Sequence, residues 1–323
     1  MAQPPPANVA ARKRLVRDLL LTGAVFAIVV GSLIGYTRTW PPALVVDSNS
    51  MQHGDASSAL GVADTGDIVL LQAVGGRGDV VTYLEGRATG YATYGDFGDA
   101  IAFAFPLSPG AVGIHRALAY VIWNGTARGY DVPDLNLLPK SEWSAWDTSN
   151  ASTDQPYGLS RFEVRDAGWR SGATLRANLT LGGWTLLVGA GETGFVTLGD
   201  NNAYRSPINV DRWIVPLPTI VGRARGEIPW LGLVRLVIAP DPEGCCESWG
   251  STDPVRGAPA NSWAALDTSL ILMASLPAAW IGAWAYLDRH PRTRQRIREA
   301  LGRLRFWRRS KGEDRKKPSQ EER

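Results

Sequence analysis

Two long uninterrupted apolar runs dominate the pattern of hydrophobic and polar positions. They are residues 19–36 (LLLTGAVFAIVVGSLIGY) and residues 268–287 (TSLILMASLPAAWIGAWAYL), and neither contains a charged side chain. A bilayer core needs about 20 apolar residues, so the pattern predicts two transmembrane helices. The first run could instead be the apolar part of a cleavable signal peptide. We favour an uncleaved anchor, because the run is long and residues 36–40 (YTRTW) lack the small side chains of a cleavage site.

The 231 residues between these runs, 37–267, show a different pattern. Short β-branched or aromatic runs alternate with Gly, Pro and Asp, while amphipathic helical patterns are scarce. This pattern predicts one mainly β domain of bent antiparallel sheets. The predicted strands include Asp67–Leu71, Asp79–Tyr83, Ala100–Phe105, Ala117–Trp123 and Ile220–Ala224. The polar, proline-bearing residues 130–159 indicate an insertion or a loop-rich subdomain.

Charge is distributed unevenly along the 323 residues, although the formal net charge is only +3. Residues 1–18 are basic, and the tail 288–323 holds 14 Lys+Arg against 6 Asp+Glu. Residues 38–263 hold 16 Lys+Arg against 23 Asp+Glu, a net charge of −7. Basic flanks stay in the cytoplasm, so we expect a two-span protein of the cell membrane. Both termini are then cytoplasmic, and residues 37–267 are extracytoplasmic.

Partners and anchors follow from this topology. The basic tail lies beside anionic lipid, so we interpret it as facing the bilayer and expect no nucleic-acid partner. Trp40 and either Trp263 or Trp284 are candidate anchors at the membrane interface.

Cysteine and asparagine motifs add little. Cys245 and Cys246 are adjacent, which leaves a vicinal disulfide, an intermolecular disulfide and two free thiols all open. Three glycosylation acceptors, Asn124, Asn150 and Asn178, fall within the predicted outer domain.

Candidate catalytic residues are few. The chain has three histidines, His53, His115 and His290, and the outer domain has a single lysine, Lys140. If the protein is a serine hydrolase, its base is therefore a histidine or Lys140. A candidate nucleophile lies in Asp47-Ser-Asn-Ser-Met51, just past the first apolar run. Candidate acids lie in residues 197–202 (TLGDNN) and 210–212 (VDR).

The order of these motifs resembles that of type I signal peptidases, specifically the archaeal and endoplasmic-reticulum branch. The resemblance covers the first apolar run and most of residues 44–232. Ile114-His-Arg116 matches the histidine box, where the bacterial branch carries lysine. The other similar motifs are SNSM at 48–51, GDIV at 66–69, GDAIAF at 98–103, GDNN at 199–202, VGR at 221–223 and IPWLG at 228–232.

The resemblance implies a Ser-His mechanism and assigns roles to individual residues. Ser50 is the expected nucleophile and His115 the general base. Asp211 is the first choice for orienting His115, with Asp200 supporting the site. The Ser48 hydroxyl and the Ser50 N–H are the expected oxyanion donors, and Met51 is expected to pack beneath the nucleophile. The implied site residues are Ser50, His115, Asp211 and Asp200, with Ser48, Met51 and Asn201 as supporting residues.

The sequence also departs from the family pattern. The family usually has Pro at the position of His53, which we interpret as a surface histidine. Residues 203–209 resemble an insertion between GDNN and Asp211. Residues 124–193 contain more chain than the family core needs.

The implied activity is that of a membrane-bound serine endopeptidase in protein secretion. It would cleave signal peptides, which end in a small-x-small pattern, from exported preproteins. The peptide would add as a strand to a sheet edge, expected near Gly66–Leu71. The expected partners are signal peptides, the lipid bilayer and the Sec translocon; no cofactor or metal is implied. The alternatives are a non-catalytic two-span surface scaffold or binding protein with a signal-peptidase-like domain, and an inactive member that assists another peptidase.

Overall fold

The computed structural model describes residues 7–54, 57–58, 60–105, 110–179, 191–204, 210–240, 244–254, 256–293 and 295. The chain divides into two compact units, residues 1–266 and residues 267–323. Most of the predicted basic tail, parts of the N-terminus, and parts of the predicted insertions at 124–193 and 203–209 lie outside the described residues.

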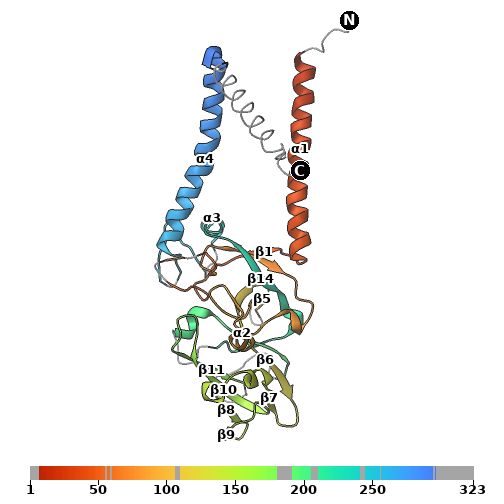
Figure 1. Cartoon of the computed structure of the whole chain (residues 1–323), viewed down its shortest axis with the longest axis vertical. Helices are drawn as coiled ribbons and strands as arrows, with labels where there is room; N and C mark the ends of the chain where they lie inside the picture. The colour runs from red at the N-terminus through yellow and green to blue at the C-terminus, as the bar shows by residue number, and fades with distance from the viewer. Residues whose placement is uncertain are drawn as a thin grey trace, which may run out of the picture. The chain divides into compact units, whose positions relative to one another are not determined.

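Unit 1 is built around antiparallel β-structure, which confirms the sheet-rich prediction (Figure 1). Twelve of its described strands form one connected sheet whose main path is β1-β2-β14-β5-β6-β7-β10-β8-β9. The strands along this path are β1 (Ala43–Val45), β2 (Ile68–Gln72), β14 (Ile220–Ile228), β5 (Ala100–Ala104), β6 (Val112–Asn124), β7 (Gly129–Asp131), β10 (Leu159–Ala167), β8 (Trp143–Asp147) and β9 (Ser152–Thr153). Beside the path lie β11 (Ala173–Asn178), β12 (Gly194–Leu198) and β13 (Ile214–Val215), and β3 (Ala92–Thr93) pairs separately with β4 (Asp96–Phe97).

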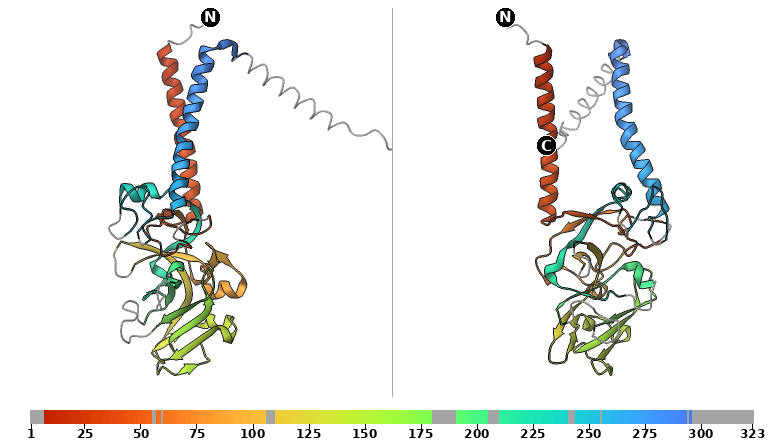
Figure 2. Two further views of the ribbon diagram at one scale, coloured as in Figure 1. Left: turned by 90° about the vertical axis from the view of Figure 1, so that its left-hand side faces the viewer. Right: turned by 180° about the vertical axis from the view of Figure 1, so that it is seen from behind.

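The long strand β6 passes between two halves of this sheet. Its first half pairs with β5, and its last residues pair with β7 at the start of the β7–β11 group. The β7–β11 group lies at the end of unit 1 away from β1, as both views of Figure 2 show. Residues 130–159 are therefore not simply loop-rich, because they contribute β7, β8 and β9. Alternating apolar side chains of β10, such as Phe162 and Val164, enter the core cluster of this half.

The prediction of a strand at Asp79–Tyr83 is wrong. A 3-10 turn ends at Asp79, and helix α2 (Tyr83–Thr89) begins at Tyr83. Thr82 caps this helix, since its hydroxyl accepts the Glu85 N–H while the Glu85 carboxylate accepts the Thr82 N–H. This capping box satisfies two backbone donors that a strand would have left to a sheet partner. The capping box formed by Thr82 and Glu85 thus favours a helix where the β-branched residues predicted a strand.

Two described helices are long and apolar enough to cross a membrane: residues 15–37 within α1 (Ala7–Thr37), and α4 (Ala260–Arg289). Both extend beyond the predicted runs of 19–36 and 268–287. Trp263, one of the predicted interface anchors, is only 4% exposed. Its indole N–H donates to the Ser251 carbonyl, so burial in unit 1 argues against an anchoring role.

Helix α3 (Leu233–Ile238) follows the last strand, and its Leu233 packs closely over Gly66, where a Cβ would lie 2.4 Å from the leucine side chain. Beyond α3, Cys245 and Cys246 are joined as a vicinal disulfide, one of the alternatives that adjacency left open. The Cys245 N–H donates to the Asp47 carbonyl at 2.8 Å. This bond ties the disulfide segment to the chain just before the candidate nucleophile.

Candidate active site

Three separate segments bring the predicted site residues together. Ser50 lies in the loop that follows β1, and His115 lies in β6 where that strand pairs with β5. Asp211 lies between β12 and β13, and its backbone N–H donates to the Thr197 carbonyl of β12. Because β12 pairs with β6, this bond brings Asp211 next to the histidine strand.

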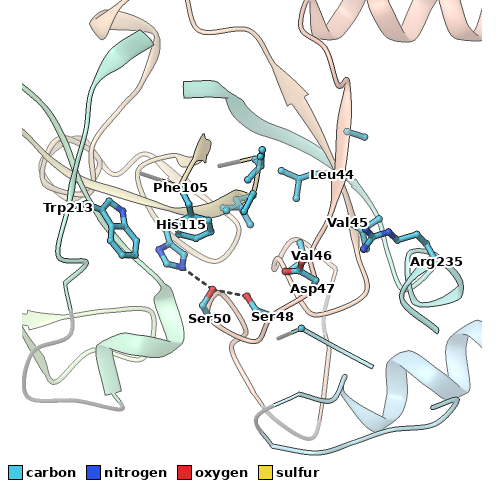
Figure 3. Close-up of a pocket in the computed structure, with 17 residues that line it drawn as sticks. Leu44, Val45, Val46, Asp47, Ser48, Ser50, Phe105, His115, Trp213 and Arg235 are labelled. Atoms are coloured by element: carbon cyan, nitrogen blue, oxygen red, sulfur yellow. Dashed lines mark hydrogen bonds between the residues drawn. The ribbon is translucent and has the colours of Figure 1, made fainter. Parts of the chain in front are cut away.

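The three side chains form a continuous chain of hydrogen bonds. His115 Nε2 lies 3.0 Å from Ser50 Oγ, and His115 Nδ1 lies 2.5 Å from Asp211 Oδ2. Figure 3 shows the histidine ring directed at Ser50. A carboxylate only accepts hydrogen bonds, so Nδ1 carries a proton and donates it. In the neutral ring, Nε2 then presents a lone pair to the Ser50 hydroxyl, which is the arrangement of a nucleophile and its base.

Burial and charge act in opposite directions on His115, which is 7% exposed. Burial disfavours the charged imidazolium and lowers the pKa, but the Asp211 carboxylate, through its charge and its hydrogen bond, and the Asp200 charge together outweigh burial. The net result is a pKa for His115 above the ordinary 6.5. The ring of His115 is thus a stronger base than a free imidazole.

The loop that carries Ser50 is held by its backbone. The Asn201 N–H donates to the Ser50 carbonyl at 2.8 Å, and the Asn201 side-chain amide donates to the Asn49 carbonyl at 2.9 Å. Gly199 packs against the same loop, where a Cβ would lie 2.7 Å from the Ser50 carbonyl oxygen. The GDNN segment therefore acts through its small residue and its amides, and it leaves the Ser50 hydroxyl directed at His115.

Ser48 lies on the cleft side of the nucleophile, with its Oγ 3.3 Å from Ser50 Oγ (Figure 3). Both serines line the same cleft as His115. The Ser48 hydroxyl is therefore close enough to share a reacting oxygen with the Ser50 backbone N–H.

Asp200 does not contact His115 in this arrangement. Its carboxylate is 2% exposed and accepts a bidentate pair from Arg116, at 2.7 and 2.6 Å. Burial acts to raise the pKa of Asp200, yet the Arg116 guanidinium and the His53 ring together outweigh it and hold the pKa below 3.8. Asp200 also bonds His53 Nε2 at 3.0 Å, and the His53 side chain is 12% exposed. The interpretation of His53 as a surface histidine is therefore wrong.

Met51 is fully buried, and it packs in the core cluster with Val46 and Ile114. Those two residues line a cleft of about 800 Å³ that also contains Ser50 and His115. Met51 itself does not line the cleft and shapes its floor through these neighbours. The opposite wall includes Phe105 and Trp213, whose rings meet edge-on at 5.4 Å (Figure 3).

Three residues of this site, Thr197, Arg116 and Trp213, had no role assigned from the sequence. Thr197 donates to Asp211 Oδ2 at 2.6 Å and so helps fix the carboxylate. Arg116 directly follows His115, and Trp213 closely follows Asp211. Alternation along β12 could have placed Thr197 and Leu198 on opposite faces of the strand, but nothing in the sequence indicated Trp213.

Within the described residues, no group of three or more His, Cys, Asp or Glu side chains is arranged to hold a metal ion. Lys140, the alternative base, lies away from the cleft in a 3-10 turn before β8: its Nζ is 3.2 Å from Asp154 Oδ1 and lies over the Trp143 ring. Neither the models of known protein families nor the sequences of curated proteins match this chain.

Proposed function

We propose that the protein is a membrane-bound serine endopeptidase of the signal peptidase type, which removes signal peptides from exported preproteins. The observation that carries this proposal is the Ser50–His115–Asp211 hydrogen-bond chain at the wall of an open cleft. A serine, a histidine and an aspartate in this order of contacts can perform acyl transfer on any fold, because the roles depend on geometry.

The proposed reaction has two halves. In the first, Ser50 Oγ attacks the scissile carbonyl while His115 Nε2 takes the hydroxyl proton and passes it to the leaving amine. The C–N bond breaks, and the signal peptide remains as an ester on Ser50. In the second half, a water attacks the ester while His115 accepts its proton. The ester C–O bond then breaks, His115 returns the proton to Ser50 Oγ, and the signal peptide leaves as a carboxylic acid. Asp211 stabilises the imidazolium that forms in each half.

The oxyanion of each tetrahedral intermediate needs donors. The Ser50 backbone N–H and the Ser48 hydroxyl are the proposed pair, since the two serine oxygens are 3.3 Å apart. Losing one such donor typically lowers kcat by about 100- to 1,000-fold.

Two unpaired strand edges offer a place for an extended substrate. Among the described strands, β1 pairs with β2 alone, so the other edge of Ala43–Val45 is open. β6 pairs with β12 only from Arg116 onward, so no described strand occupies the second edge of Val112–His115. Both segments line the cleft, and an extended peptide added there would satisfy their free backbone groups. The strand expected near Gly66–Leu71 is not available, because β2 is paired on both sides.

The proposed place of action is the outer face of the cell membrane. Two described helices are long and apolar enough to span it, and both flanks are basic. Enzyme and signal peptide would then share one membrane, which raises their effective concentration. The Sec translocon, which delivers such preproteins, is a proposed neighbour.

The test is cleavage of a preprotein by the purified full chain in lipid vesicles. Ser50→Ala should abolish cleavage because it removes the attacking oxygen, and Ser48→Ala should reduce kcat less severely. Ser149→Ala is a matched control, since Ser149 is an exposed residue that bonds Asp147 in the β8–β9 turn. Undiminished cleavage by Ser50→Ala would exclude the proposed nucleophile. A non-catalytic scaffold predicts no cleavage by any of the variants or by the original chain.

A further inference from the structure

The turn between β10 and β11 reaches back to the loop that carries Ser50. Trp169 in this turn stacks on the His53 ring, with ring centroids 4.5 Å apart and planes 4° from parallel. The same turn is fixed to the segment after GDNN, because the Arg170 N–H donates to the Tyr204 hydroxyl at 3.0 Å. Tyr204 also meets the Trp169 ring edge-on at 5.9 Å. A part of segment 124–193 is thus packed against the catalytic half of unit 1.

His53 is held from three directions. Trp169 covers one face of the ring, and Asp200 Oδ2 lies 3.0 Å from Nε2. The β3–β4 turn approaches at Gly95, where a Cβ would lie 2.7 Å from His53 Cε1. Gly95 has a φ of +79°, so both its conformation and its missing side chain suit this close approach.

Asp200 connects these contacts to the catalytic residues. Its carboxylate is paired with Arg116, the residue next to His115 in β6. Through His53 the same carboxylate holds the chain three residues beyond Ser50. One buried anion therefore links the strand of the base to the loop of the nucleophile. Since neither His53 nor Trp169 lines the cleft, both would act at a distance from the reacting atoms.

We propose that His53 and Trp169 are positioning residues, through which the β10–β11 turn fixes the Ser50 loop relative to His115. The proposal rests on the proposed peptidase function, and it gives segment 124–193 a role in catalysis. A displacement of about 1 Å between nucleophile and base can cost about 100-fold in rate. Loss of the stack or of the Asp200 bond should therefore lower kcat, while KM, which depends on the cleft, changes little.

The kinetic test uses the full chain with matched variants. Trp169→Ala should lower kcat by about tenfold to 100-fold with KM within about twofold, and Trp169→Phe should restore most of the rate. At position 53, His53→Gln keeps a donor for Asp200 whereas His53→Phe keeps only the ring, so Gln should retain more activity. Trp146→Ala is the control, because Trp146 lies in β8 of the same sheet and pairs with Arg161 instead. Equal kcat in Trp169→Ala, Trp146→Ala and the original chain overturns the proposal.

A second measurement separates this inference from the proposed function. Backbone hydrogen exchange of residues 47–54 should be faster in Trp169→Ala and His53→Phe than in the original chain, and unchanged in Trp146→Ala. Exchange reports the packing of the loop whether or not the protein cleaves preproteins. If the original chain cleaves nothing but the loop exchanges as expected, the peptidase function fails while the positioning contact stands. Unchanged exchange in both variants refutes the positioning role directly.

Discussion

At the scale of single residues, His115 determines how the proposed activity depends on pH. A general base works only when deprotonated, and the pKa of His115 lies above 6.5. Activity should therefore fall as the pH drops through a midpoint above 6.5. Asp211→Asn removes the charge that raises this pKa and leaves the burial that lowers it. The midpoint should then move to lower pH. The plateau rate should also fall, since the same change in a Ser-His-Asp triad lowers kcat by about 10⁴-fold.

The measurement is kcat/KM between about pH 5 and about pH 9, a range that brackets an ordinary imidazole. Lys140→Ala is the control, because its ammonium is engaged with Asp154 and Trp143 away from the cleft. A rate that keeps rising into the alkaline range, together with a large loss in Lys140→Ala, would point to a lysine base. The contribution of His115 to stability should follow the opposite trend. Its pKa is higher in the folded state than in the unfolded state, so His115 stabilises the fold at low pH, and this contribution is lost as the pH rises through the folded-state pKa.

The site residues could be predicted from the sequence as far as motif order identifies individual residues. The motif order predicts Ser50, His115 and Asp211, and the structure brings Ser50 and Asp211 within hydrogen-bonding distance of His115. The contacts between segments could not be predicted. Thr197, Arg116 and Trp169 gain their partners only through the pairing of β12 with β6 and the return of the β10–β11 turn. His53 was misread for the same reason, since a lone histidine in a polar loop gives no sign of a stacking partner more than a hundred residues away.

At the scale of elements, the start of α2 offers a direct test. Thr82 caps the helix and also donates to the buried Asp134 carboxylate at 2.9 Å. Thr82→Ala should lower the free energy of unfolding by about 1 kcal/mol, the usual cost of losing such a cap. Denaturant unfolding followed by tryptophan fluorescence would measure it. Thr89→Ala in the last turn of the same helix is the control, because Thr89 is exposed and bonds only helix carbonyls. Equal losses in the two variants would contradict the capping role.

The strands that the sequence identified best are those with apolar runs free of helix signals. Ala100–Ala104 is almost wholly buried between β14 and β6, and its continuous apolar run reflects burial on both faces. The polar strands of the β7–β11 group were harder to identify. Residues 130–159, which contribute β7, β8 and β9, were predicted to be an insertion or a loop-rich subdomain, and β10 mixes buried residues with half-exposed and exposed ones. Its pairing with β8 and β11 establishes β10 as a strand, which its composition alone does not indicate.

At the scale of the whole molecule, charge and hydropathy make a prediction about topology. Both basic flanks should lie in the cytoplasm, because Lys and Arg stay on that side of short membrane-flanking segments. A tag fused after Arg323 should therefore survive protease added outside intact cells, whereas a tag inserted in the exposed β8–β9 turn should be removed. Permeabilised cells provide the control, because the protease then reaches both tags. Loss of the C-terminal tag from intact cells would exclude the two-span arrangement.

The end of α1 is attached to the sheet at several points within a few residues. The Ala73 N–H donates to the Thr37 carbonyl, the Thr39 hydroxyl donates to the Val221 carbonyl, and the Tyr36 hydroxyl donates to the Arg225 carbonyl. The segment that leads from α1 toward Ser50 is thus attached to the sheet at its start. If the apolar part of α1 lies in a bilayer, the nucleophile works at one fixed height above it. The length of the substrate's apolar segment would then determine which peptide bond reaches Ser50, so the distance from the membrane would select the cleavage site.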